Sequence, residues 1–295
     1  MSIVSASDIL NKATKGGYAV GAFNITSIMQ MQAVIEAAAG LKAPVIIQTS
    51  ESPAKMIGPE VIAAAYRELA SRAGIPVVLH LDHSTDVDFC KRCIDAGYTN
   101  IMIDASSHPY DDNVRITKEV VDYAREKGGV TVEGELGTVS GVEDQVIVAE
   151  NDSVLCDPDL GISFSKATGI DLLAPAIGTA HGVYKTENPK IDVARMRAIR
   201  TKADEAGMEL PLVIHGGTGL SEGIVKRLIA AGGSKYNVST ELKYAWIDGA
   251  AAFTAQKPLV YNPNKLMQSQ MDASAAVVIK WIKILGSEGK GGSNA

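Results

Sequence analysis

The sequence predicts an α/β protein, a single (β/α)8 TIM barrel over residues 1–286, because strand-like and helix-like segments alternate along its 295 residues. Short runs of β-branched and apolar residues have the length of strands. Most of them do not alternate with polar residues, which is typical of strands buried on both faces of a parallel sheet. The predicted strands are Tyr18–Phe23, Ala43–Gln48, Pro76–Leu81, Asn100–Ile103, Val130–Glu135, Leu172–Ile177, Leu212–Ile214 and Lys235–Val238.

Amphipathic stretches between these strands predict the helices, several of them with a Ser or Asp in the capping position. An open, doubly wound sheet is the alternative architecture, but the glycine-rich dinucleotide turn that opens such a sheet is missing after the first strand. The alternation therefore favours a barrel. The predicted helices are Ser27–Leu41, Pro59–Arg72, Asp86–Ala96, Asp111–Lys127, Asp192–Ala206, Ser221–Ala231 and Glu241–Ala255.

Two segments interrupt this rhythm. Residues 137–168 form a long connection after the fifth strand, and we expect a mobile lid there. Residues 287–295 are polar and glycine-rich, and we expect a flexible C-terminal tail.

Charge and composition exclude several classes of protein. The chain carries a net charge of −6 with its basic residues scattered, which argues against nucleic acid or an anionic membrane as a partner. The first residues lack the pattern of a secretory signal, and no apolar run reaches membrane-spanning length. Three cysteines are an odd number in a chain too large to need disulfides, and we interpret Cys90 and Cys93 as structural. We expect a cytoplasmic protein.

Polar residues gather where the predicted strands end, and in a barrel these ends meet at one mouth. One histidine at a strand end is more often a packing residue than a ligand. Here His83, His181 and His215 follow three separate strands, and three protein ligands with an open position describe a catalytic zinc site, although a ligand set alone does not fix the metal. Carboxylates beside such a site can carry protons or orient the histidines. The candidates are Asp82, Asp104, Glu133 and Glu135, with His80 beside them.

A glycine-rich turn, His215-Gly-Gly-Thr-Gly-Leu220, follows the seventh strand and leads into a helix at Ser221. Such a turn offers backbone N–H groups and a hydroxyl to a phosphate. Asn237-Val-Ser-Thr240 follows the eighth strand, and barrels most often bind phosphate after strands seven and eight. We therefore expect a phosphate site beside the metal.

Together these motifs resemble class II fructose-bisphosphate and tagatose-bisphosphate aldolases. The resemblance runs collinearly from about residue 18 to residue 255. It rests on AFN near Asn24, HLDH at 80–83, MID at 102–104, ELG with GxED at 135–144, AIGTAHGVYK at 176–185, HGGTGL at 215–220 and NVSTELK at 237–243.

The resemblance implies a metal-dependent aldehyde-lyase that reversibly cleaves a ketose 1,6-bisphosphate to dihydroxyacetone phosphate and glyceraldehyde 3-phosphate. In it, His83, His181 and His215 align with ligands of a catalytic Zn²⁺, and Asp104 and Glu135 align with an alternative or second metal position. Asp82 aligns with the acid that protonates the aldehyde during condensation. Glu143, in the long loop, aligns with the carboxylate that exchanges a proton with the ketone's carbon. A monovalent cation, Na⁺ or K⁺, often assists at the substrate site. The aligned substrate-binding positions are Asn24, Ser50, Gly182, Gly216, Gly217, Thr218, Asn237, Val238, Ser239 and Thr240.

Departures from the family pattern leave alternatives open. Ser239 stands where fructose-bisphosphate enzymes carry an acidic residue, and the family's C-terminal Asp-Pro-Arg is replaced by Asn262-Pro-Asn-Lys265. Because Lys does not reproduce the phosphate fork of Arg, the aldehyde half can lack a phosphate, as a semialdehyde does. A lysine-based aldolase is disfavoured because the sixth strand carries no lysine. An inactive scaffold subunit is disfavoured because Asp82 and all three histidines are present. By analogy the chain is expected to be a homo-oligomer, a dimer or tetramer.

Overall fold

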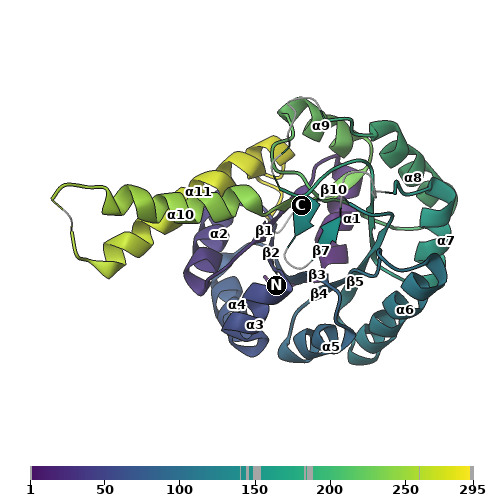
Figure 1. Ribbon diagram of the computed structural model, residues 1–295, viewed down its shortest axis with the longest axis horizontal. Helices are drawn as coiled ribbons and strands as arrows, with labels where there is room; N and C mark the ends of the chain where they lie inside the picture. The colour runs from purple at the N-terminus through teal and green to yellow at the C-terminus, as the bar shows by residue number, and fades with distance from the viewer. Residues whose placement is uncertain are drawn as a thin grey trace.

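Eight parallel strands close into a barrel in this computed structural model, which describes residues 2–139, 141–143, 146–148, 154–182, 184, 189–258 and 260–292 (Figure 1). Their order around the barrel is β1-β10-β9-β8-β5-β4-β3-β2, so the last strand closes against the first. The predicted (β/α)8 architecture is confirmed. The strands are β1 (Val20–Asn24), β2 (Val45–Thr49), β3 (Val77–Ser84), β4 (Asn100–Ile103), β5 (Thr131–Leu136), β8 (Leu172–Pro175), β9 (Leu212–Ile214) and β10 (Gly233–Val238).

Helices surround the barrel and cover its outer face. Their starts follow the caps expected from the sequence: the side chains of Ser27, Asp86 and Asp192 each accept a backbone N–H of the first turn. Each predicted helix is present, with ends that shift by a few residues. The helices of this layer are α2 (Ile28–Gly40), α3 (Glu51–Ile57), α4 (Pro59–Ala73), α5 (Val87–Ala96), α6 (Tyr110–Lys127), α7 (Pro158–Thr168), α8 (Val193–Glu205) and α9 (Glu222–Ala230).

Alternate strand residues face opposite sides of the sheet, which divides the buried residues into two sets. Residues such as Phe23, Leu79 and Tyr236 point outward and pack in the layer beneath the helices. The inward set begins with an apolar layer at the N-terminal ends of the strands, including Val78 and Val213. Helix α1 (Ala6–Gly16) packs on this layer and closes that end of the barrel. Further along the strands the inward residues become polar.

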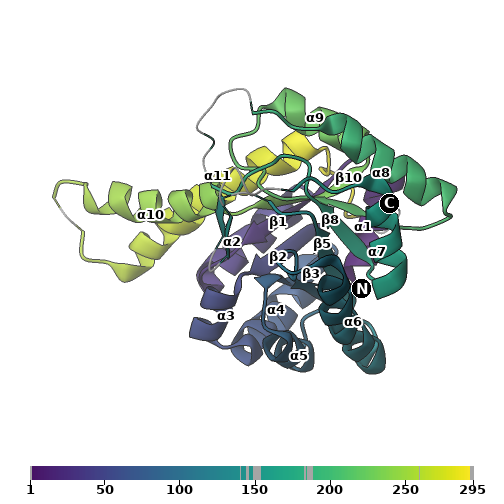
Figure 2. The same cartoon turned by 45° about the vertical axis from the view of Figure 1, so that its right-hand side comes forward.

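A helical hairpin projects from the barrel on the side of β1 and β2 (Figures 1 and 2). It consists of α10 (Thr240–Thr254) and α11 (Pro263–Leu285), which pack along each other. Helix α10 starts directly after β10, and α11 returns to the barrel, where Trp281 packs against Tyr236 with ring centroids 4.8 Å apart. The sequence patterns predicted α10 but not α11.

The long connection after β5 contains secondary structure that was not predicted. Strands β6 (Gly141–Glu143) and β7 (Val146–Val148) pair antiparallel, and α7 occupies residues 158–168 of the segment expected to be a lid. A capping Asp157 followed by Pro158 starts this helix, a signal that the sequence does contain.

The C-terminal segment returns to the barrel after α11. The N–H groups of Gly289 and Gly291 donate to the carbonyls of Leu41 and Lys42 at 2.9 and 2.7 Å, and the Ser287 side chain is buried. Residues 287–292 are thus bound to the end of α2, and the last three residues lie outside the described part of the chain. Among the helices described, none is long and apolar enough to cross a membrane.

Candidate active site

Three histidines converge at the C-terminal end of the barrel. His83 lies in β3, His181 follows β8 and His215 follows β9. The ring centroid of His83 is 4.8 Å from that of His181 and 4.5 Å from that of His215, and one nitrogen of each ring lies within 4.8 Å of the others. Strands distant in sequence therefore bring three nitrogen ligands to one point, in the number that a catalytic zinc site uses.

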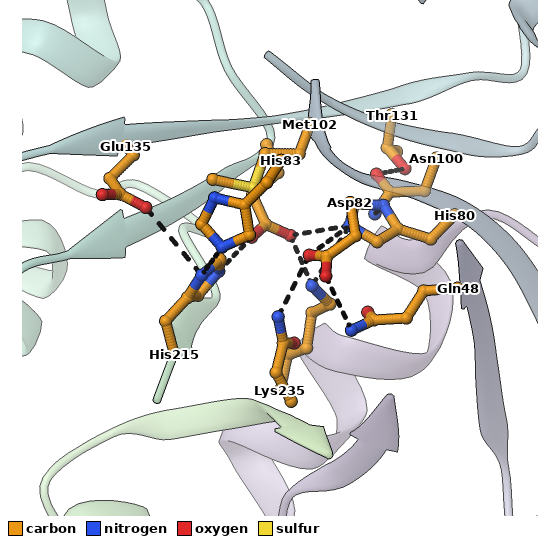
Figure 3. Close-up of polar contacts among 12 residues, drawn as sticks. Gln48, His80, Asp82, His83, Asn100, Met102, Thr131, Glu135, His215 and Lys235 are labelled. Atoms are coloured by element: carbon orange, nitrogen blue, oxygen red, sulfur yellow. Dashed lines mark hydrogen bonds and ion pairs between the residues drawn. The ribbon is translucent and has the colours of Figure 1, made fainter. Parts of the chain in front are cut away.

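Carboxylates behind two of these rings select which nitrogen faces the centre. Glu133 Oε1 lies 2.8 Å from Nε2 of His215, and Asp104 Oδ2 lies 3.0 Å from Nδ1 of His83. Because a carboxylate only accepts, each of these nitrogens carries its proton on that side. His215 Nδ1 and His83 Nε2 face each other across 2.6 Å (Figure 3). The two carboxylates therefore direct these two nitrogens toward the centre, as the partners of metal-binding histidines do.

Negative charge exceeds positive charge around this point. Within the barrel, the carboxylates of Asp82, Asp104, Glu133 and Glu135 are buried, whereas Lys235 is the only buried Lys or Arg side chain among the described residues. Glu135 Oε2 is buried without a hydrogen-bond partner. Burial and the neighbouring Asp104 raise the pKa of Glu135 well above its usual value. Buried charges require partners, so the residues present fit a divalent cation.

The pKa values of two of these histidines shift in opposite directions. Burial lowers the pKa of His181 well below its usual value, and the neighbouring His83 lowers it further. Burial also opposes protonation of His83, but Asp82 and then Asp104 outweigh it and raise its pKa to about 10. The carboxylates thus favour a positive charge at His83, whereas burial and the neighbouring histidines keep His181 neutral.

Two overlapping residue groups can hold a metal. One is the three-histidine group, and the other joins His83 to Asp104 and Glu135, with ligand atoms also within 4.8 Å of one another. The nitrogen-only group suits zinc, and the group with two carboxylates suits a harder ion. His83 is common to both, and its backbone is left-handed with φ 47°, a conformation that a non-glycine residue rarely adopts.

Asp82 lies beside the histidines and is held by three amides. Asn24 Nδ2 donates to its Oδ2 at 2.8 Å, Gln48 Nε2 donates to the same atom at 3.2 Å, and Asn237 Nδ2 donates to Oδ1 at 3.1 Å. Burial alone would raise the pKa of Asp82, but the charge of His83 and the hydrogen bond with His80 hold it well below its usual value. The carboxylate is therefore ionised and fixed in orientation.

A pocket opens above Asp82 between the ends of β8, β9 and β10. Gly216 comes so close to the backbone of Ala180 that a Cβ would collide with it, and its φ of 61° also favours glycine. Tyr184 ties the two loops together: its hydroxyl donates to Gly216 O at 2.7 Å and accepts from Ala180 N at 3.0 Å. Ser239 and Thr240, at the start of α10, line the same space, and helix N-termini are suited to binding anions. The pocket is lined by Asn24, Asp82, His181, Gly182, Gly216, Gly217, Thr218, Asn237, Ser239 and Thr240.

Most of the residues singled out in the sequence meet at this site, and a few do not. Ser50 is buried at the end of β2, and it and Val238 are not among the residues that line the pocket. Glu143 lies in β6, and its side chain is outside the part of the chain that the structure describes. The backbone of Gly141, two residues earlier, packs directly against that of His181, so this hairpin starts beside the three histidines.

The sequence patterns missed the residues beneath the site. Gln48, Asn100 and Lys235 were not singled out, and Glu133 was noted only as a carboxylate near the mouth. All four point into the barrel and bond to one another or to site residues. For three of them a signal was present: Gln48, Glu133 and Lys235 each lie two residues before another polar residue on the same buried strand or at its end, and residues two apart face the same side. Asn100 has no such neighbour.

Comparisons with known proteins identify the family of the chain. The family model "Fructose-bisphosphate aldolase class-II" matches residues 4–290. A fructose-bisphosphate aldolase of Geobacillus stearothermophilus is 44% identical over 293 residues, which cover 98% of this chain and 99% of that protein.

Solved structures agree as well. The crystal structure of the YdjI aldolase from Escherichia coli K12 is similar with a TM-score of 0.84 at 30% identity, covering 98% of this chain and 99% of the other. The fructose-bisphosphate aldolase of Campylobacter jejuni shares the fold, with a TM-score of 0.81 at 22% identity over 98% of this chain and 97% of that one. The chain is an aldolase, and it belongs to the class II fructose-bisphosphate aldolase family.

Proposed function

We propose that the protein catalyses the reversible, zinc-dependent cleavage of a ketose 1,6-bisphosphate to dihydroxyacetone phosphate and glyceraldehyde 3-phosphate. The observation that carries this proposal is the convergence of His83, His181 and His215 beside a pocket that contains an ionised Asp82. An electrophile, a proton carrier and an anion-binding loop within one pocket are the parts that an aldol cleavage requires.

The three histidines would hold the zinc, with Glu133 behind His215 and Asp104 behind His83. Bound zinc supplies a Lewis acid that polarises the ketone carbonyl of the substrate. The group His83, Asp104 and Glu135 supports a second or alternative position for a divalent ion. His83 belongs to both groups, so the same histidine would bind the ion in either position.

Asp82 would accept the proton of the C4 hydroxyl as the C3–C4 bond breaks and the aldehyde leaves. Its amide donors, Asn24, Gln48 and Asn237, keep the carboxylate aimed and ionised for this transfer. Glu143 would then return a proton to C3. In condensation the same transfers run backward, so Asp82 protonates the aldehyde oxygen.

The phosphate of the dihydroxyacetone phosphate half would lie against Gly182, Gly216, Gly217 and the start of α10. The close approach of these glycines to the pocket and the N–H groups of residues 239–240 support this position, where a Na⁺ or K⁺ can assist. Asn24 and Thr218, which line the same pocket, belong to the proposed substrate-binding set. Ser50 and Val238 are included on the family resemblance alone.

The second phosphate has no partner in Lys265 of the same chain. Lys265 lies in the first turn of α11, at the far end of the α10–α11 hairpin, whereas the pocket lies at the start of α10. Fifteen residues of α-helix separate the two ends, about 22 Å at 1.5 Å per residue. The preference between a phosphorylated and a plain aldehyde is therefore the first property to measure.

We also propose that the chain forms a homo-oligomer, a dimer or tetramer. The projecting hairpin supports this, because it exposes large apolar side chains: Tyr244, Ile247 and Tyr261 are 55%, 64% and 91% exposed. Large apolar side chains exposed on a projecting element are typical of an interface.

The test is coupled cleavage of fructose 1,6-bisphosphate, tagatose 1,6-bisphosphate and fructose 1-phosphate, each before and after treatment with a chelator and restoration of zinc. We expect zinc-restorable cleavage of one of the bisphosphates in preference to the monophosphate. Activity that survives chelation would remove the metal assignment. Equal turnover of the monophosphate would instead indicate an aldehyde half without a phosphate.

A further inference from the structure

Lys235 is a buried cation that the proposed mechanism does not use. It lies in β10 with a fully buried side chain, and its Nζ is 2.9 Å from Glu133 Oε2 and 3.3 Å from His80 Nε2. It does not line the pocket, whereas Asn237, two residues further along the same strand, does. Two strand residues span about 6.6 Å, so the ammonium lies one layer beneath the substrate.

Glu133 connects this lysine to the metal-binding group. Its Oε2 accepts from Lys235 at 2.9 Å, and its Oε1 lies 2.8 Å from Nε2 of His215. Each carboxylate oxygen thus has its own partner, and the ion pair fixes the rotation of the carboxylate. The orientation of His215 depends on that rotation.

The remaining neighbour, His80, is held from its other side. Asn100 Nδ2 lies 2.7 Å from His80 Nδ1, and Thr131 Oγ1 donates to Asn100 Oδ1 at 2.8 Å (Figure 3). The amide therefore donates to Nδ1, which leaves the proton of neutral His80 on Nε2. A protonated Nε2 cannot accept from the ammonium, so Glu133 is the functional partner of Lys235.

We propose that Lys235 is a positioning residue: it holds Glu133 against Nε2 of His215, and through this contact it sets the affinity of the site for zinc. The inference rests on the proposed function, because it takes His215 as a zinc ligand. Partners behind a metal-binding histidine typically change metal affinity 10- to 100-fold when they are lost. Lys235 acts one step further from the metal, through the carboxylate.

The experiment measures zinc affinity by competition with a chromophoric chelator, together with the visible spectrum of the Co²⁺-substituted protein. Lys235→Met leaves Glu133 without its counter-ion, and we expect zinc affinity to fall roughly 10-fold or more, with a changed Co²⁺ spectrum. Glu133→Gln should weaken zinc binding as well. With Lys235 present, the amide oxygen of Gln turns to the ammonium and its NH₂ group faces His215 Nε2, which disfavours the required tautomer.

The double variant Lys235→Met/Glu133→Gln gives the sharpest outcome. Without the ammonium, the amide oxygen is free to face His215, so the double variant should bind zinc about 3-fold more tightly than Glu133→Gln, or better. A substitution that weakens binding in one background and strengthens it in the other is not expected of a residue that only stabilises the fold. The double variant removes both charges of the Lys235–Glu133 pair and leaves neither partner without the other, so this comparison remains available if Lys235→Met alone does not fold.

Two control variants separate positioning from general effects. Lys226→Met makes the same chemical change at an exposed lysine paired with Glu222, and Tyr66→Phe removes a buried hydrogen bond to Val77 O. Neither should change zinc affinity. Wild-type zinc affinity in Lys235→Met, or a double variant weaker than Glu133→Gln, would overturn the inference alone. Failure of the wild-type protein to bind zinc, or zinc binding that survives His215→Ala, would overturn the proposed function with it.

Discussion

The two ends of the barrel are lined by opposite kinds of side chain, although the same strands build both. At the N-terminal end, inward residues such as Val78 and Val213 form an apolar layer under α1. At the C-terminal end the inward residues of the same strands are Asp82 and His215. Four residues along β3 thus separate a hydrophobic plug from a buried carboxylate.

The two ends of the barrel contribute differently to the stability of the fold and to the chemistry of the site. The N-terminal end gains free energy from apolar burial, while the C-terminal end collects buried charges that cost free energy until an ion and a substrate bind. Substitutions at the two ends should therefore affect different measurements, and four variants test that expectation.

Asp82→Asn should have the largest effect, and on activity alone. Removing a proton carrier typically costs about 10²- to 10⁴-fold in rate, so kcat should fall by that amount. Zinc content should stay at the wild-type level, because Asp82 belongs to neither candidate metal group. A variant with near-normal kcat would mean that another group moves the proton.

Leu10→Ala should have the opposite profile. Leu10 is fully buried in α1 over the apolar layer, and truncating such a side chain costs about 2–5 kcal/mol of unfolding free energy. Denaturant unfolding measures this loss. At a temperature where the variant is folded, kcat should match the wild type; a large fall in kcat would show that the two ends are coupled.

Glu135→Gln should stabilise the metal-free protein. A substitution at the C-terminal end of the barrel would then raise the free energy of unfolding, whereas Leu10→Ala at the N-terminal end lowers it. The Glu135 carboxylate is buried beside Asp104, and its Oε2 accepts no hydrogen bond and lies 3.8 Å from His215 Nδ1, so a neutral isostere relieves roughly 1–2 kcal/mol. Thermal unfolding of chelator-treated protein measures the gain. The benefit should shrink when metal is added, and a lower melting temperature in the metal-free state would contradict the assignment of surplus negative charge.

Ser5→Ala should give the smallest effect. Ser5 caps α1, accepting from Asp8 N at 3.3 Å while its own N–H donates to the Asp8 carboxylate at 3.1 Å. Loss of such a cap costs about 1 kcal/mol. We expect that shift in denaturant unfolding with unchanged kcat; an effect on zinc affinity would be incompatible with a purely structural α1.

The contrast also explains what could be predicted from the sequence. Residues at the C-terminal end, such as His83 and His215, stand out because charged groups directly after apolar runs are rare, and barrel geometry brings strand ends together. The strands themselves were predicted because uninterrupted apolar runs are typical of parallel sheets.

The missed features depend on contacts that no local pattern encodes. In the sequence Lys235 is an ordinary strand residue. Its partner Glu133 lies in β5, 102 positions earlier in the chain, and only the folded barrel brings the two together. Helix α11 is stabilised by packing on α10 and on Tyr236, which its own sequence does not reveal. The connection after β5 was interpreted as a loop because its strands, β6 and β7, are each only three residues long.

Closure of the barrel between β1 and β10 has a consequence for the order of assembly during synthesis. His83, Asp104 and Glu135 are complete once β5 has been made, whereas His215 follows only with β9. Asn237, which holds Asp82 across 155 positions, arrives with the final strand. Because chains are made from the N-terminus, every residue of the oxygen-rich group is synthesised before the three-histidine group is complete, and the residue that holds Asp82 across the barrel is synthesised after both. The contact between Asn237 and Asp82 therefore forms only when all eight strands have been made.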